Sequence, residues 1–238
     1  MSLNKNRGFT LVELMLAMAF VSALLVAVAM TVIQIGNMYN RGITYKSVNQ
    51  AGGALASELQ RGINGSSPFD ISTNGSGEGA HYVTKSWGGR LCLGQYSYIW
   101  NYGAAIASAD LAHMNIYSAP DSSKPIGFIK VLDPSSSYCA NPYSTITYSG
   151  AVELLDASES GLAIHSFSID SDPTTLYDSG TDQRLYNISF LIGTNDQKAL
   201  TDNYGAKECK TLSEINSDTA YCAVNQFDIV ARSGNTAG

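Results

Sequence analysis

The chain has 238 residues, of which 45% are hydrophobic and only 14% are charged. This apolar content is enough to bury a core, which excludes a chain that is disordered throughout. Acidic residues outnumber basic ones by 20 to 14, which argues against a protein that holds nucleic acid through phosphate contacts. The length fits one ordinary domain with an additional element.

The charges are unevenly distributed along the chain. Residues 1–8 contain Lys5 and Arg7 and no acid, so the remainder of the chain is more acidic than the whole. A basic start before an acidic body is typical of a sorting signal. We therefore interpret Lys5 and Arg7 as the charges of a short leader.

The apolar run at residues 9–35 predicts a membrane-inserting helix. Between Leu14 and Ile33 there is no charged residue, Pro or Gly. A helix over this stretch is about 30 Å long, which is enough to cross a bilayer. The run is too long for the apolar region of an ordinary cleaved signal peptide. The basic flank before it favours a cytoplasmic N-terminus and an exported C-terminus.

Glu13 does not fit a plain membrane anchor, because it lies near the start of the apolar run. An unpaired carboxylate in or near hydrocarbon is costly, and such residues usually mark function. The next charged residue along the chain is Arg41, so the same helix offers no partner. The sequence therefore predicts that Glu13 pairs with a group on another chain.

The residues Gly8-Phe9-Thr10-Leu11-Val12-Glu13, between the basic leader and the apolar run, resemble the class III prepilin signal of type IV pilins and pseudopilins. The resemblance implies that a prepilin peptidase cuts between Gly8 and Phe9 and methylates the new N-terminal Phe9. It also implies that Phe9, Thr10, Leu11, Val12 and Glu13 take part in filament assembly. Glu13 would pair with the N-terminal ammonium of a neighbouring subunit, since two charges in an apolar core are tolerated only when paired.

Residues 36–64 are expected to continue the helix as an amphipathic segment. Val48, Ala51, Leu55, Leu59 and Ile63 recur every three or four residues, which places them on one helical face. Four glycines weaken this part by about 1 kcal/mol each and offer places to bend: Gly36, Gly42, Gly52 and Gly53. The helix is predicted to end near Asn64, with Gly65 as a left-handed cap and Pro68 barring continuation.

The rest of the chain predicts a loop at 65–79, rich in Gly and Ser, and a β-rich extracytoplasmic head at 80–238. Short strands separated by turns favour an antiparallel sheet, covered on one face by the amphipathic helix, and hence an α+β fold. The order of elements is most similar to W-type minor pilins and J-type pseudopilins. The predicted strands are His81–Trp87, Leu91–Tyr102, Ile126–Leu132, Leu162–Ile169, Leu185–Ile192 and Val224–Arg232.

The four cysteines, Cys92, Cys139, Cys209 and Cys222, all lie beyond the apolar run. No pair forms C-x-x-C, which argues against a zinc or thioredoxin-like site. An even number of cysteines in an exported protein indicates disulfides, and four allow three pairings. We favour Cys92–Cys139 and Cys209–Cys222, because each closes a modest local loop.

The head offers no catalytic constellation in its sequence. His81, His113 and His165 each lie more than four residues from another His or Cys, and no nucleophile elbow, P-loop or H-E-x-x-H occurs. We therefore expect no enzyme and no cofactor. One oxygen-rich stretch could bind calcium, although its spacing departs from the EF-hand and solvated turn carboxylates are the favoured interpretation. The residues in question are Asp170, Asp172, Asp178 and Asp182.

Tyr96, Tyr98, Trp100 and Tyr102 lie two residues apart, so on a strand they share one face. Such rows more often fill a core, but an exposed strip would suit a binding surface on a tip adhesin.

Together these features predict a minor pilin or pseudopilin, a structural subunit of a type IV pilus or type II secretion-like filament. The many major pilins that carry a helix-kinking Pro inside the apolar run differ from this chain, which has none there. The resemblance implies other pilins, prepilin peptidase and an inner-membrane assembly platform as partners. It places the chain in the cytoplasmic membrane and then in a filament at the cell surface. A ligand-binding tip pilin and a DNA-uptake pseudopilin are the alternatives, and the few, scattered basic residues of the head count against the latter.

Overall fold

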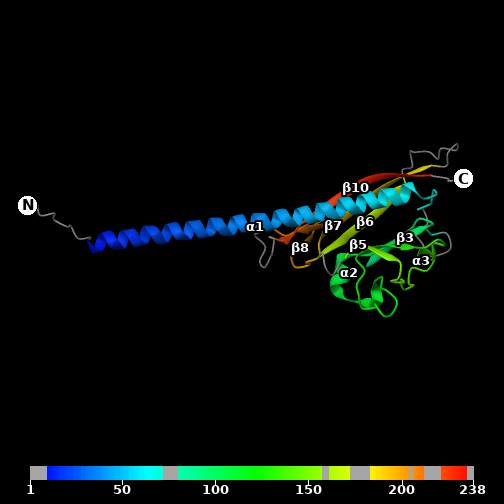
Figure 1. Cartoon of the computed structure of the whole chain (residues 1–238), viewed down its shortest axis with the longest axis horizontal. Helices are drawn as coiled ribbons and strands as arrows, with labels where there is room; N and C mark the ends of the chain where they lie inside the picture. The colour runs from blue at the N-terminus through cyan, green and yellow to red at the C-terminus, as the bar shows by residue number, and fades with distance from the viewer. Residues whose placement is uncertain are drawn as a thin grey trace, which may run out of the picture.

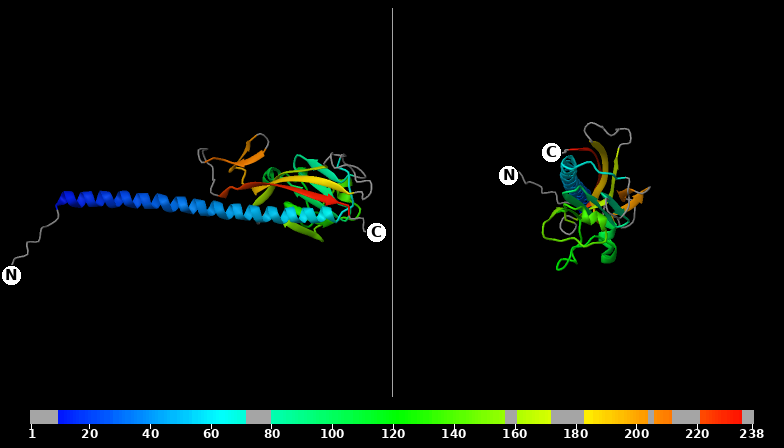
Figure 2. Two further views of the ribbon diagram at one scale, coloured as in Figure 1. Left: turned by 90° about the horizontal axis from the view of Figure 1, so that it is seen from above. Right: turned by 90° about the vertical axis from the view of Figure 1, so that its right-hand side faces the viewer.

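The structure is a computed structural model that describes residues 10–71, 80–156, 161–171, 183–203, 206–211 and 221–234. Its largest element is one helix, α1 (Leu11–Asn64). The N-terminal half of α1 projects away from the β-structure, and its C-terminal half lies along the sheets (Figure 1). Two further views show the same separation (Figure 2). The predicted α+β fold, a long helix packed on antiparallel sheets, is confirmed.

Helix α1 begins and ends close to the predicted residues. Thr10 caps its N-terminus, and the first turn contains an acid, Glu13. The helix is unbroken through its glycines, so the predicted bending points are helical. At the C-terminus, Gly65 has φ −89° and ψ −2° and its N–H donates to Arg61 O at 3.1 Å. The predicted left-handed cap at Gly65 is therefore wrong, because the chain leaves the helix through one more right-handed residue.

The head contains two antiparallel sheets and a separate hairpin among its described residues (Figure 1). The larger sheet has the order β1-β2-β3-β4-β5, and the smaller has the order β10-β7-β6. The hairpin pairs β8 with β9. The strands are β1 (Tyr82–Lys85), β2 (Gly88–Cys92), β3 (Tyr96–Asn101), β4 (Phe128–Leu132), β5 (Ala151–Leu155), β6 (Leu162–Ser171), β7 (Arg184–Thr194), β8 (Leu200–Asn203), β9 (Ala206–Cys209) and β10 (Val224–Ser233).

Each predicted strand range overlaps a strand of the structure, but the predictions are incomplete. The predicted strand Leu91–Tyr102 is wrong as one element, because Gly94 adopts φ +87° and reverses the chain between β2 and β3. The short strands β5, β8 and β9 were not predicted from the sequence. The same is true of three short helical elements in the connections: α2 (Gly103–Ser108), η1 (Leu111–His113) and α3 (Ser137–Ala140).

The main core lies where α1 and the two sheets meet. Aromatic rings run through it from one sheet to the other: the Trp100 ring lies 4.3 Å from that of Phe167 and 5.5 Å from that of Phe128. This series of aromatic rings extends towards α1 through Phe190 and Phe227, whose ring centroids are 5.3 Å apart. A Cβ added at Gly52 of α1 would overlap the Phe227 ring, so this glycine permits the close approach of helix and strand.

The other face of the larger sheet is covered by the connections between its strands. A second cluster there contains Ile99, Tyr117 and Ile129. Arg90, only 2% exposed, holds these connections by donating to the Tyr138 and Ser144 carbonyls, at 2.9 and 2.7 Å. Burial lowers the pKa of Arg90 to about 10, which still leaves it charged at neutral pH. A cation this deeply buried is tolerated because its donors have acceptors.

Two disulfides tie these outer segments to the strands, and they have the pairing that the sequence favoured. Cys92 at the end of β2 is bonded to Cys139 in α3. Cys209 at the end of β9 is bonded to Cys222, just before β10. Each bond closes a loop and thereby restricts the unfolded chain.

Candidate functional site

The N-terminal half of α1 exposes apolar side chains on every side. From Leu11 to Ile43, the large hydrophobic side chains are between 50% and 75% exposed. Contiguous apolar surface of this extent marks a membrane-binding or protein-binding region. By length and hydropathy, α1 is the one described helix that can cross a membrane.

The start of α1 is organised by Thr10 and Glu13. The Glu13 N–H donates to Thr10 Oγ1 at 3.3 Å. In return, Glu13 Oε2 accepts from the Thr10 backbone N–H at 3.1 Å and from Thr10 Oγ1 at 2.9 Å. This reciprocal arrangement is a capping box, which satisfies backbone donors that have no partner inside the helix. Among the described residues, no basic group forms an ion pair with Glu13.

Several predicted site residues lie outside the described residues. These are the leader and cleavage residues Lys5, Arg7, Gly8 and Phe9, and three of the calcium candidates, Asp172, Asp178 and Asp182. The fourth candidate, Asp170, is an exposed residue near the end of β6. No group of three metal-ligating side chains occurs in the part of the chain that the structure describes.

The aromatic row that runs along β3 does not form an exposed surface. Tyr98 and Trp100 are fully buried in the main core, and Tyr96 and Tyr102 are partly covered. The favoured interpretation, a core row, is correct for Tyr98 and Trp100, and the less favoured interpretation of the four residues as an exposed binding strip is wrong. The reason is that α1 and the smaller sheet pack against this face of β3, which a single strand's alternation cannot reveal.

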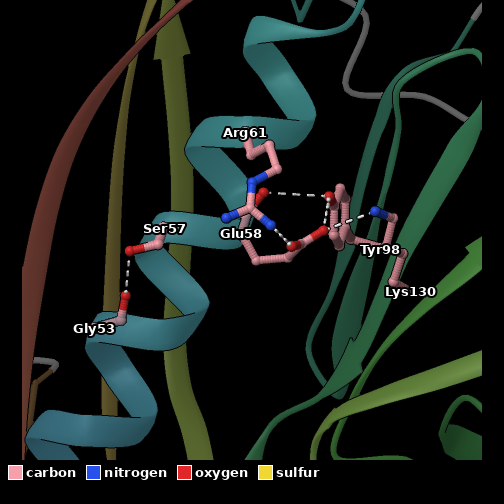
Figure 3. Close-up of polar contacts among 6 residues, drawn as sticks. All are labelled: Gly53, Ser57, Glu58, Arg61, Tyr98 and Lys130. Carbon is pink, nitrogen blue, oxygen red and sulfur yellow. Dashed lines mark hydrogen bonds and ion pairs between the residues drawn. The ribbon is translucent and has the colours of Figure 1, made fainter.

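A polar cluster beneath the C-terminal half of α1 fixes the helix to the larger sheet (Figure 3). Glu58 of α1 forms an ion pair with Lys130 of β4 at 2.7 Å and accepts from the Tyr98 hydroxyl at 3.2 Å. Arg61, one turn on, lies 3.5 Å from the same carboxylate. Lys130 Nζ also lies 4.1 Å from the centroid of the Tyr96 ring. The sequence reasoning missed this cluster, because Lys130 is distant from Glu58 along the chain.

The environment of Glu58 favours its charged form. Burial of this carboxyl opposes ionisation, but the hydrogen bond and the positive charge of Lys130 outweigh burial, so the pKa of Glu58 lies below its ordinary value. Burial also raises the pKa of the Tyr98 hydroxyl, with a further contribution from the Glu58 charge, so Tyr98 remains a neutral donor. The cluster therefore acts as a charged attachment between helix and sheet.

The three histidines make hydrogen-bonding contacts with three different residues. His81 Nδ1 lies 2.9 Å from Cys92 O, His113 Nδ1 lies 2.8 Å from Asp110 Oδ2, and His165 Nε2 lies 3.0 Å from Thr194 O. Each contact is to a different element. In these three contacts each ring nitrogen meets a backbone carbonyl or a carboxylate, and none meets a Ser, Thr or Cys side chain.

Comparison with known proteins bears on the N-terminal segment of the chain. Residues 3–33 match the prokaryotic N-terminal methylation motif, which is typical of type IV pilins and pseudopilins. No protein with a curated description matches the chain, and no solved structure matches it. The chain is a pilin-like protein: it has the prepilin methylation motif, an N-terminal hydrophobic helix, an α+β head and two disulfides. Proteins of this class are generally structural subunits without enzymatic activity.

Proposed function

We propose that this chain is a minor pilin or pseudopilin, a structural subunit of a type IV pilus or a type II secretion-like filament. The observation that supports this most is the division of one unbroken helix into two environments. Its first half exposes apolar side chains on all sides, and its second half is anchored in the head. Such a helix can first insert in a bilayer and then pack with equivalent helices of other subunits.

In this proposal, residues 1–8 are a leader that prepilin peptidase removes between Gly8 and Phe9. Residues 9–35 form the membrane and filament-core helix, and 36–64 join it to the head at 80–238 through the loop at 65–79. The partners are prepilin peptidase, an inner-membrane assembly platform and other pilins. The chain starts in the cytoplasmic membrane with its head outside the cytoplasm, and ends in a filament at the cell surface.

Processing is tested by intact mass and N-terminal sequencing of the protein from cells with and without prepilin peptidase. We expect a chain that starts at methylated Phe9 only when the peptidase is present. A chain with the same N-terminus in both strains, or a cut after the apolar run, would overturn the proposal.

The capping box allows a sharp test of the role of Glu13. Glu13→Gln retains a side-chain oxygen that can accept from Thr10 but loses the charge, whereas Glu13→Ala loses both. If Glu13 pairs with the N-terminal ammonium of a neighbour, both variants should be cleaved normally and both should be reduced about tenfold or more in sheared filaments, since an uncompensated buried charge is strongly destabilising. Entry of Glu13→Gln at the wild-type level would show that the cap, and not the charge, is needed.

A further inference from the structure

A shallow, open cleft of about 360 Å³ lies between α1, β9 and the start of β10. Arg41 and Tyr45 of α1 line one side, and Lys207 and Glu208 of β9 line another. Asn225 at the start of β10 completes the wall and donates to Asn49 Oδ1 of α1 at 2.7 Å. Figure 1 shows β8 and this end of β10 at the end of the head that faces the exposed half of α1.

The cleft contains one cation and one anion without an ion-pair partner among the described residues. The Arg41 guanidinium lies 5.6 Å from the centroid of the Tyr45 ring, and no described carboxylate lies within ion-pair distance of it. Lys207, by contrast, is paired with Asp202 at 2.8 Å. Glu208 accepts from Asn203 Nδ2 at 3.0 Å, and no described basic group forms an ion pair with it.

With residues 14–35 across the hydrocarbon, as the proposed function requires, the cleft lies at the edge of the bilayer. The helix from Leu14 to Ile35 is about 33 Å long, which matches the hydrocarbon thickness. Arg41 follows Ile35 by about 9 Å along the helix axis, at the depth of lipid headgroups. Tyr39, 68% exposed, and Tyr221, 56% exposed and hydrogen-bonded to Asn40, lie at the same level. Tyr side chains are enriched at membrane interfaces, and Arg side chains that flank a membrane helix can reach the headgroups.

We propose that this cleft binds the headgroup of an ethanolamine phospholipid at the outer face of the membrane, before the subunit leaves for the filament. The phosphate is held by the Arg41 guanidinium, whose planar donors suit phosphate oxygens. The ammonium is held by the Glu208 carboxylate. A zwitterionic headgroup with a primary ammonium matches this pair, because its N–H groups can donate to the Glu208 carboxylate, which the trimethylammonium of choline cannot do. An anionic glycerol headgroup would face the Glu208 carboxylate without a compensating cation. The inference rests on the proposed function, since it requires the helix to be in a bilayer.

The experiment measures lipids retained by the purified full-length chain in native mass spectrometry, titrated separately with phosphatidylethanolamine, phosphatidylglycerol and phosphatidylcholine. We expect the wild type to retain phosphatidylethanolamine about fivefold better than either other lipid. Arg41→Ala should abolish this preference. Glu208→Gln should reduce it and raise the retention of phosphatidylglycerol. Arg232→Ala, the loss of an exposed cation at the far end of β10, is the matched control and should behave as the wild type.

Wild-type retention of phosphatidylethanolamine by Arg41→Ala would overturn the inference. So would equal competition by soluble phosphoethanolamine, which would identify a soluble ligand as the source of the phosphate. Thermal unfolding of each variant checks that the head is intact, and Arg41, an exposed helical residue, gives a result even if Glu208→Gln does not fold. Alkaline extraction of the chain from vesicles separately tests membrane insertion, so failure of the proposed function is distinguishable from failure of the lipid site.

Discussion

The two halves of α1 have the same backbone and opposite relations to the rest of the molecule. From Leu11 to Ile43 the apolar side chains are exposed all round the helix. From Val48 to Ile63 the buried side chains, including Leu55 and Leu59, form one stripe against the head. A helix that is apolar on all sides needs a membrane or other subunits, whereas an amphipathic helix is completed by its own chain. The difference shows that one helix combines a half that leaves its apolar surface uncovered with a half that completes the core of the head.

The largest expected effect comes from the same substitution made in each half. Leu59→Ala removes a fully buried side chain from the main core and should lower the free energy of unfolding of the head by about 2–5 kcal/mol. Leu25→Ala removes a side chain that is 62% exposed and should change it by less than about 0.5 kcal/mol. Denaturant unfolding of the full chain in detergent measures both, and equal effects would contradict the division of the helix.

Two adjacent glycines sharpen the comparison within the anchored half. An added methyl group at Gly52 overlaps the Phe227 ring, so Gly52→Ala should destabilise the head by about 1–2 kcal/mol despite the better helix propensity of Ala. At Gly53 no atom lies within 4 Å of the added Cβ, so Gly53→Ala should stabilise the helix by up to about 1 kcal/mol. Thermal unfolding should therefore shift in opposite directions; a shift in one direction for both would show that the packing at Gly52 is looser than described.

The smallest expected effect concerns the charged attachment of the helix. Glu58→Gln should cost about 1 kcal/mol at pH 7, because the pair with Lys130 is only partly shielded from solvent. The pKa of Glu58 is lowered in the folded state, so its contribution is complete above the ordinary value of 4.5 and is lost as the pH falls through the lower folded value. The stability difference between wild type and Glu58→Gln should thus shrink on acidification. A difference that does not vary with pH would contradict a charged attachment.

Sequence reasoning was most successful where the signal is local. The bounds of α1 follow from the apolar run, a periodicity of three to four residues and the Gly-Pro region that ends the helix, all of which are local signals, although the predicted conformation of Gly65 is wrong. The long strands β6, β7 and β10 were predicted from alternation and turns. The turn at Gly94 and the short strands β5, β8 and β9 were missed, because few residues alternate in them and their partners set their bounds.

The sequence by itself determined the class of this protein. The residues around Phe9 and Glu13 and the long apolar run predict membrane insertion and assembly from composition and order alone, because hydrophobicity and leader recognition act on a linear segment. Only the tertiary structure decided that the Tyr98 and Trp100 row is core, that Glu58 meets Lys130, and that Arg41 and Glu208 share a cleft. These contacts join residues far apart in the chain, and their partners become neighbours only when helix and sheets pack.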